Sequence, residues 1–141
     1  MKYWINVVSK DHVLAGMAEG FVQAGHGKPP DLRVLNRGDV IFFYSPGTLF
    51  RAGALLQAFT AVGRVADDAP YQVETAAGTF PWRRNMTALA CEEAPIEPLV
   101  PELSFIPDKT SWATSLPRGM FEIGTDDARR IASAMKADIA R

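Results

Sequence analysis

The chain has 141 residues, 48% of them hydrophobic, and its 15 basic and 16 acidic side chains give a formal net charge of −1 at pH 7. This composition excludes a disordered chain and a strongly basic nucleic-acid protein, and the single cysteine excludes an internal disulfide. The length predicts a single domain over residues 1–141. Because no apolar run could cross a bilayer and Met1–Trp4 lacks a signal-peptide pattern, we expect a soluble cytoplasmic protein.

The first predicted element is a strand over Lys2–Val8, a segment rich in β-branched and aromatic residues. Strand alternation places Trp4 on the opposite face from its immediate sequence neighbours. A helix is expected next, with Ser9 or Asp11 as its N-cap. The apolar residues that follow at helical spacing are Val13, Leu14, Met17 and Phe21, and the pattern is then broken by Gly20 and Gly25.

The middle of the chain carries the segment around which we expect the fold to form. Val40–Tyr44 is an unbroken apolar and aromatic run, preceded by a Gly-Asp turn signal and followed by Ser45–Gly47, a Ser-Pro-Gly sequence. Such a run predicts a strand that is buried on both faces and ended by the Ser-Pro-Gly. Tyr44 and Ser45 then emerge at the strand end, where we expect them to line any pocket. Leu32–Leu35 is expected to pair briefly before this strand.

The second half of the chain predicts more strands, a surface segment and a closing helix. The expected strands are Leu55–Val65, Tyr71–Thr75, Phe80–Leu89 and Phe121–Ile123, and the segment expected to cross the surface in extended form is Glu92–Pro101. Gly63 predicts a bulge or a close backbone approach. Thr125–Ala140 has apolar residues at helical spacing, with Thr125 as its expected N-cap. Short strands that do not alternate regularly with helices predict an α+β fold with a strongly bent mixed sheet.

Signatures of catalysis are missing from the sequence. It has no glycine-rich phosphate loop, and Ser45 does not lie in a nucleophile elbow. Cys91 with His12 or His26 matches no known spacing for a nucleophile or a zinc site. We therefore expect no catalytic residues, no metal and no cofactor.

Aromatic side chains gather near the predicted strand ends, among small polar residues. Phe42, Phe43 and Phe59 fit a packed core. Small polar residues near Trp4, Tyr44 and Trp112 favour an aromatic cage for a ligand. Recognition of a planar base requires aromatic faces with a few fixed hydrogen-bond donors.

The sequence resembles the EVE domain family in an ordered set of segments over nearly the whole chain. These are Lys2–Lys10, Gly20–Lys28, Arg37–Pro46, Leu56–Gly63, Pro81–Arg84, Ile96–Leu99, Phe105–Ile106 with Lys109 and Trp112, and Arg118–Ile123. The resemblance implies a PUA-like fold, a bent, barrel-like mixed sheet with flanking helices, similar to YTH, ASCH and PUA domains. It also implies a non-catalytic module that holds a modified base of DNA or RNA in an aromatic pocket.

The resemblance and the aromatic pattern together predict a base-binding pocket. Its expected residues are Trp4, Asn6, Ser9, Lys10, His12, Tyr44, Ser45, Phe59 and Trp112. Within it we expect Trp4 and Trp112, with Tyr44 and Ser45, to hold one flipped, modified base. Phosphate contacts are expected from His26, Lys28, Arg51, Arg83, Arg84 and Arg118. The expected partner is a nucleic acid carrying a modified base, bound by a monomer.

Two other functions remain compatible with the sequence. One is a nucleic-acid-processing enzyme of the ASCH type, for which Lys10, His12, His26, Lys28 and Asp39 are the plausible acid and base residues. The other is a small-metabolite sensor that uses the same pocket. A turnover assay separates the enzyme from the two binding functions, and a comparison of free nucleosides with oligonucleotides separates the reader from the sensor.

Overall fold

The computed structural model describes residues 1–23, 30–49, 52–117 and 119–140. In chain order its helices and strands are β1 (Tyr3–Val7), α1 (Lys10–Glu19), β2 (Phe21–Gln23), α2 (Pro30–Arg33), β3 (Val40–Leu49), β4 (Ala52–Val65), β5 (Tyr71–Gln72), β6 (Trp82–Ala88), β7 (Ala94–Pro95), a 3₁₀ helix (Glu97–Glu102), α3 (Trp112–Ser115), β8 (Met120–Ile123) and α4 (Thr125–Ala134).

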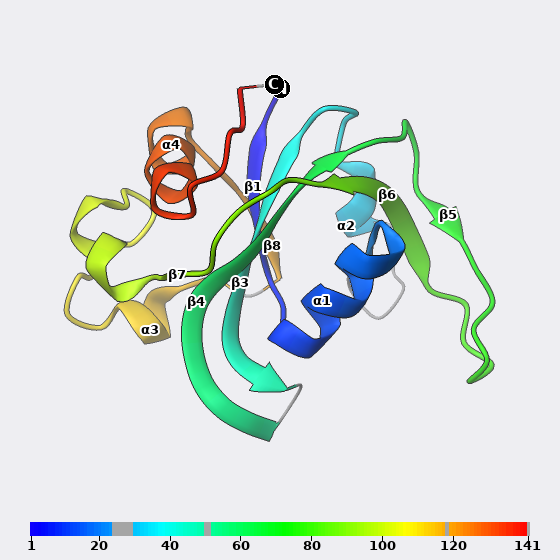
Figure 1. Cartoon of the computed structure of the whole chain (residues 1–141), viewed down its shortest axis with the longest axis horizontal. Helices are drawn as coiled ribbons and strands as arrows, with labels where there is room; N and C mark the ends of the chain where they lie inside the picture. The colour runs from blue at the N-terminus through cyan, green and yellow to red at the C-terminus, as the bar shows by residue number, and fades with distance from the viewer. Residues whose placement is uncertain (24–29, 50–51, 118, 141) are drawn as a thin grey trace.

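The strands form one curled mixed sheet with the order β2-β6-β4-β3-β1-β8, to which β5 adds beside β6 and β7 beside β4. β3 lies at its centre, parallel to β1 and antiparallel to β4. The β1–β3 register pairs Trp4 with Ile41 and Asn6 with Phe43. Figure 1 shows β3 and β4 as a long curved hairpin that extends beyond the rest of the sheet. The α+β, PUA-like fold expected from the sequence is confirmed, with a half-barrel sheet and flanking helices.

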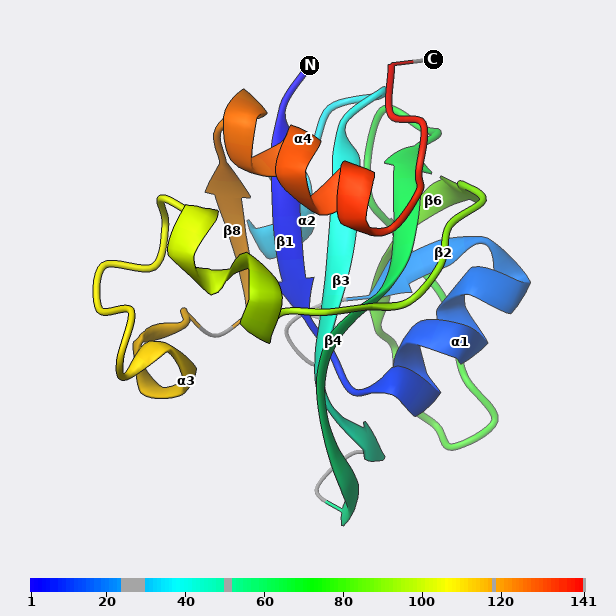
Figure 2. The ribbon, with the colours of Figure 1, turned by 60° about the vertical axis from the view of Figure 1, so that its left-hand side comes forward.

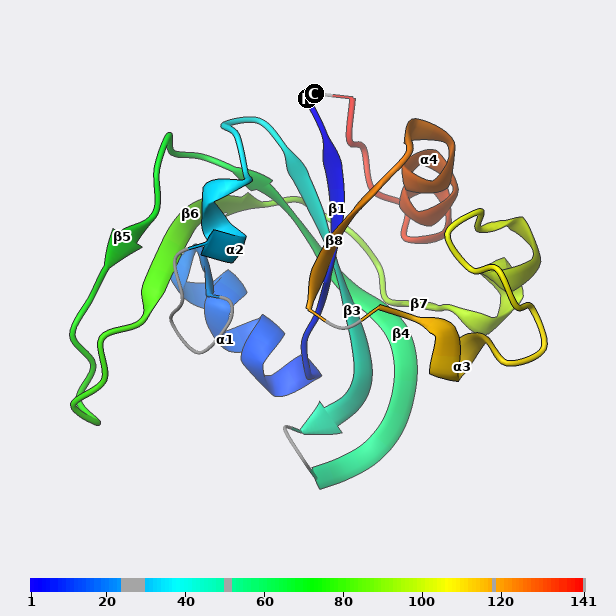
Figure 3. The same ribbon diagram turned by 180° about the vertical axis from the view of Figure 1, so that it is seen from behind.

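Side chains on the two faces of the central strands enter two separate cores. Core one includes Ile5, Val40, Phe42 and Tyr44, and it is covered by α4 and the 3₁₀ helix. Core two includes Trp4, Ile41 and Phe43, and it is covered by α1 and α2. Figure 2 shows α4 across one face of β1 and β3, and Figure 3 shows α1 and α2 on the other side of these strands. The prediction that Val40–Tyr44 is a central strand buried on both faces is confirmed, since all five residues are buried.

Several boundaries differ from the expected ones around β3. The Ser-Pro-Gly sequence does not end the strand, which continues to Leu49 through register shifts on both sides of Gly47. Pro46 is tolerated because it lies in this irregular, exposed part of the ladder. The expected pairing of Leu32–Leu35 is wrong: the helical turn α2 precedes β3, and a spacing of three residues buries both leucines on one side.

The later segments also differ from their predicted form. The expected extended crossing at Glu92–Pro101 contains the 3₁₀ helix, because Leu99 and Val100 turn inward and are buried. The N-cap of α4 is Gly124 rather than Thr125, and α4 ends at Ala134, before the left-handed residue Lys136. None of the helices in the described ranges is long and apolar enough to span a membrane.

Tyr44 makes core one sensitive to alkaline pH. Its side chain packs edge-on against Phe59, with 5.5 Å between the ring centroids, and burial raises the pKa of Tyr44 to about 12. The folded protein therefore keeps the phenol protonated at a pH where the unfolded chain loses the proton, near 10. We therefore expect the contribution of Tyr44 to stability to be full below pH 10 and to fall by about 2–3 kcal/mol as the pH rises from 10 to 12.

We expect Tyr44→Phe to lose less stability than the wild type between pH 9 and pH 11 in urea unfolding measurements. The substitution removes only the group that titrates, while the aromatic ring that fills the core remains. An equal loss in both proteins would show that Tyr44 does not titrate on unfolding.

Candidate functional site

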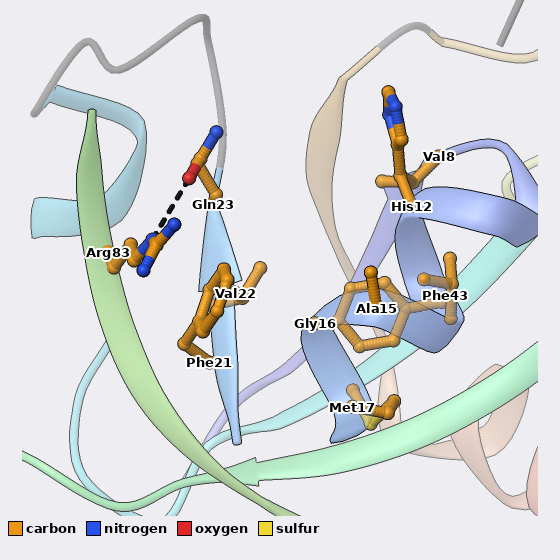
Figure 4. Close-up of a pocket in the computed structure, with 11 residues that line it drawn as sticks. Val8, His12, Ala15, Gly16, Met17, Phe21, Val22, Gln23, Phe43 and Arg83 are labelled. Carbon is orange, nitrogen blue, oxygen red and sulfur yellow. Dashed lines mark hydrogen bonds between the residues drawn. The ribbon is translucent and has the colours of Figure 1, made fainter. Parts of the chain in front are cut away.

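A cavity of about 270 Å³ opens between α1 and β2 on the core-two side of the sheet. Figure 4 shows α1 on one side of this pocket and β2 with Arg83 on the other. Its lining residues come from the end of β1, from α1, β2, β3 and β6: Val8, His12, Val13, Ala15, Gly16, Met17, Phe21, Val22, Gln23, Phe43 and Arg83. The pocket therefore has a mostly apolar lining, with three longer polar side chains at different points of its wall.

Two glycines, Gly16 within α1 and Gly20 directly after it, allow α1 to approach β2 closely at the pocket. Gly20 ends the helix with a φ of +79° and donates its N–H to the Gly16 carbonyl at 2.8 Å, so the chain turns directly into β2. A Cβ atom at Gly16 would lie 2.8 Å from the Phe21 carbonyl oxygen. Any side chain at Gly16 would therefore push β2 away from α1 and change the shape of the pocket.

The β2–β6 wall of the pocket is organised around Arg83. This residue is the cross-strand partner of Gln23, and its Nε donates to Gln23 Oε1 at 3.0 Å. Its guanidinium carbon lies 3.8 Å from the centroid of the Phe21 ring. A cation over an aromatic face is held by electrostatic attraction as well as packing, so Arg83, Phe21 and Gln23 form one ordered surface. His12, exposed on α1, projects from the opposite side of the pocket (Figure 4).

Two buried polar atoms lie where β1 passes into α1. Asn6 is 3% exposed, and neither its Nδ2 nor Ser9 Oγ has a hydrogen-bond partner among the described residues. Ser9 stands at the N-cap position of α1 without the expected side-chain cap. Asn6 is the strand partner of Phe43, and Ser9 follows Val8, and both Phe43 and Val8 line the pocket. The two residues are therefore direct neighbours of residues that line the pocket, without lining it themselves.

Comparison with known proteins identifies the family. The EVE domain model matches residues 2–134. The chain belongs to the EVE domain family. It is 53% identical to a UPF0310 protein of Mycolicibacterium vanbaalenii over 96% of this chain and 93% of that one, and 45% identical to the UPF0310 protein msl3206 of Mesorhizobium japonicum over 96% and 92%. EVE family membership supports a nucleic-acid-binding module as the general class of this protein.

Two solved structures share the fold of this EVE domain. The NMR structure of Rpa0253 from Rhodopseudomonas palustris superposes with a TM-score of 0.60 at 14% identity, covering 96% of this chain and 94% of that one. The crystal structure of Atu2648 from Agrobacterium tumefaciens gives a TM-score of 0.58 at 11% identity, covering 94% and 92%. At these identities the likeness concerns the fold alone.

The EVE domain does not bring the expected aromatic cage together. Trp4 belongs to core two, where its Nε1 donates to Asp39 Oδ2 at 3.1 Å, whereas Tyr44, Phe59 and Trp112 belong to core one or pack against it. Alternation along β1 and β3 places Trp4 and Tyr44 on opposite faces of the sheet. The cage of Trp4, Tyr44 and Trp112 around one base is therefore contradicted by the structure.

Of the other residues that the sequence predicts in the pocket, some line it or lie next to it, and others lie elsewhere. His12 lines the pocket, and Asn6 and Ser9 adjoin it. Ser45 is buried with its Oγ 2.8 Å from Thr60 Oγ1, and Lys10 forms an ion pair with Glu93 at 2.9 Å. Neither Ser45 nor Lys10 lines the pocket.

The expected phosphate-binding residues also have different locations. Arg83 lines the pocket. Arg84, its neighbour on β6, is completely buried, and its guanidinium donates to Asp67 and to the carbonyl oxygens of Leu32 and Leu35. Placing Arg84 among the phosphate ligands is therefore wrong, because no ligand could reach it. The remaining expected residues lie outside the described part of the chain: His26, Lys28, Arg51 and Arg118.

Sequence reasoning missed the β2 wall of the pocket. The helical spacing predicts that Phe21 belongs to the helix, but Gly20 ends α1 and Phe21 begins a strand of three residues. A strand this short shows no clear alternation. The one available signal was the glycine that ends the helical pattern, because a glycine there predicts that the next residue leaves the helix.

Proposed function

We propose that this EVE domain binds nucleic acid that carries a modified base and takes that base into the pocket between α1 and β2, without catalysis. The observation that supports this most strongly is the pocket itself. It joins an apolar lining that includes Phe43 to a guanidinium that is stacked on Phe21 and bonded to Gln23. Unpaired bases are recognised in this way, by stacking on aromatic rings or guanidinium planes and by hydrogen bonds to the base edge.

The size of the pocket favours one small planar group. Pockets for drug-sized ligands occupy roughly 300–1,000 Å³, and this cavity, at about 270 Å³, lies just below that range. A single ring system with a small substituent suits this space.

The energetics favour a modified base only modestly. Unstacking a base costs a few kcal/mol, and stacking in the protein returns about 1–3 kcal/mol. A methyl group buried against Val8, Val13 or Met17 adds about 0.8 kcal/mol. Discrimination between a modified and a plain base therefore depends on polar contacts at the wall as well as on the extra methyl.

The positive charge at the pocket favours a nucleic-acid strand, with its phosphates, over a free base as the ligand. Arg83 contributes a fixed cation at the wall, and the His12 imidazole lies on the opposite side of the pocket. Phosphates beside the bound base would meet these groups. We therefore expect an oligonucleotide to bind more tightly than the corresponding free nucleoside, with an affinity that falls as salt rises.

A binding screen tests this proposal. Fluorescence anisotropy with short single-stranded DNA and RNA oligonucleotides, each carrying one modified base and each matched to its plain counterpart, is expected to show at least a tenfold preference for one modification, or about 1.4 kcal/mol. Mass spectrometry of the oligonucleotide after incubation is expected to show no change. Equal binding of modified and plain strands would contradict base reading, tighter binding of the free nucleoside would favour a metabolite sensor, and an altered strand would favour an enzyme.

A further inference from the structure

The hydrogen bond between Arg83 and Gln23 fixes the polarity of one wall of the pocket. A guanidinium has N–H donors and no acceptor, so the atom of the Gln23 amide that meets Arg83 Nε must be its oxygen. The amide nitrogen is then turned away from Arg83, as Figure 4 shows. Gln23, which lines the pocket, thus keeps both N–H donors of its amide for a ligand, while its oxygen is already engaged by Arg83.

Arg83 is itself held in place by its surroundings. Its guanidinium lies against the Phe21 ring, 3.8 Å from the centroid, and its backbone pairs with Gln23 on one side and with Tyr71 on the other. Because Arg83 and Gln23 are direct cross-strand partners, their side chains project from the same face of β2 and β6. The pairing of β2 with β6 therefore sets the orientation of the Gln23 amide.

We infer that Arg83 is a positioning residue that locks the Gln23 amide with its donor free, and that the pocket selects bases whose edge presents a hydrogen-bond acceptor to Gln23. The acceptor is a ring nitrogen or an exocyclic carbonyl oxygen. This inference rests on the proposed function, because it concerns how a base bound in that pocket is read. A base that turned only N–H groups toward this wall would face the N–H donors of Gln23. Donors on both sides would then lack acceptors, which is unfavourable.

The substitution Gln23→Glu reverses this polarity with little change in shape. The new carboxylate still accepts from Arg83 Nε, but it has no donor left for the ligand. Asn85→Asp is the matched control on β6: it makes the same change from amide to acid, and it keeps the oxygen that accepts from Tyr71 Oη at 2.6 Å. Asn85 does not line the pocket.

The experiment measures the affinity of wild type, Gln23→Glu, Asn85→Asp and Arg83→Met for two oligonucleotides. One carries the modified base that wild type binds best, and the other carries an analogue with C–H in place of the acceptor atom. We expect wild type and Asn85→Asp to prefer the acceptor-bearing strand by about tenfold. Gln23→Glu is expected to lose this preference, and Arg83→Met to weaken it, because the Gln23 amide is then free to rotate.

The outcomes separate this inference from the proposed function. A preference that is unchanged in Gln23→Glu and Arg83→Met would overturn the inference and leave base binding intact. An equal loss in Asn85→Asp would also overturn it, because an added negative charge would then explain the effect. If wild type shows no preference for any modified strand, the proposed function fails, and the inference fails with it.

Discussion

Replacing Arg84 with Met is expected to lower the free energy of unfolding by about 3–5 kcal/mol, the range seen when one partner of a buried ion pair is removed. Arg84 is 0% exposed, and its Nε donates to Asp67 Oδ1 at 2.6 Å while its Nη1 donates to the Leu32 and Leu35 carbonyls at 2.8 and 2.7 Å. The substitution leaves the partly buried Asp67 carboxylate and both carbonyl groups without these donors. Because domains are stable by about 5–15 kcal/mol in total, this loss is a large fraction of the whole.

The neighbouring arginine provides the matched control. Arg83→Met removes the same charge one residue earlier on β6, but the Arg83 side chain faces the pocket and its hydrogen bond to Gln23 is exposed. We expect Arg83→Met to change stability by less than about 1 kcal/mol. Urea unfolding followed by circular dichroism measures both variants, and equal stabilities for Arg83→Met and Arg84→Met would contradict the assignment of Arg84 to the core.

Arg84→Lys keeps the charge and tests the geometry. A lysine ammonium cannot reproduce the planar guanidinium that reaches Asp67 and the carbonyl groups of Leu32 and Leu35 at the same time. We expect a stability between those of wild type and Arg84→Met, measured in the same way. This variant also provides a folded protein for comparison if Arg84→Met is too unstable to purify.

The sequence predicted the central elements of the fold because their patterns are strong and local. Val40–Tyr44 has five consecutive apolar or aromatic residues, and α4 has a clear apolar stripe, so both elements lie where they are predicted, although β3 continues to Leu49 and α4 ends at Ala134. Where one long-range contact decided the structure, sequence patterns failed. The Leu32–Leu35 segment became a helical turn whose carbonyl oxygens meet Arg84, a residue about fifty positions later in the chain.

The site was harder to predict because it depends on which face of the sheet each side chain takes. Trp4 and Tyr44 lie on the adjacent strands β1 and β3, but they belong to cores on opposite faces of the sheet, and nothing in the aromatic composition reveals this. Arg83 and Arg84 show the same effect within one strand. Strand alternation predicts that these two arginines lie on opposite faces of the sheet, but the sequence does not show which of the two faces is accessible to a ligand.

Ala15→Trp is expected to weaken binding of a modified oligonucleotide at least a hundredfold, or about 2.7 kcal/mol. Ala15 is exposed on α1 and its side chain borders the pocket (Figure 4). An indole at this position fills much of the cavity from the solvent side, without entering core two. Stability should change by less than about 1 kcal/mol, since the substitution affects an exposed helix position and helix propensity alone.

Ala18→Trp serves as the control for this substitution, because Ala18 is also exposed on α1 but does not line the pocket. The decisive measurement is the dissociation constant of wild type, Ala15→Trp and Ala18→Trp for one modified oligonucleotide, determined by fluorescence anisotropy under the same salt conditions. The proposed base pocket predicts that Ala15→Trp loses binding while Ala18→Trp binds as wild type does. Full-strength binding by a folded Ala15→Trp protein would show that the base lies elsewhere.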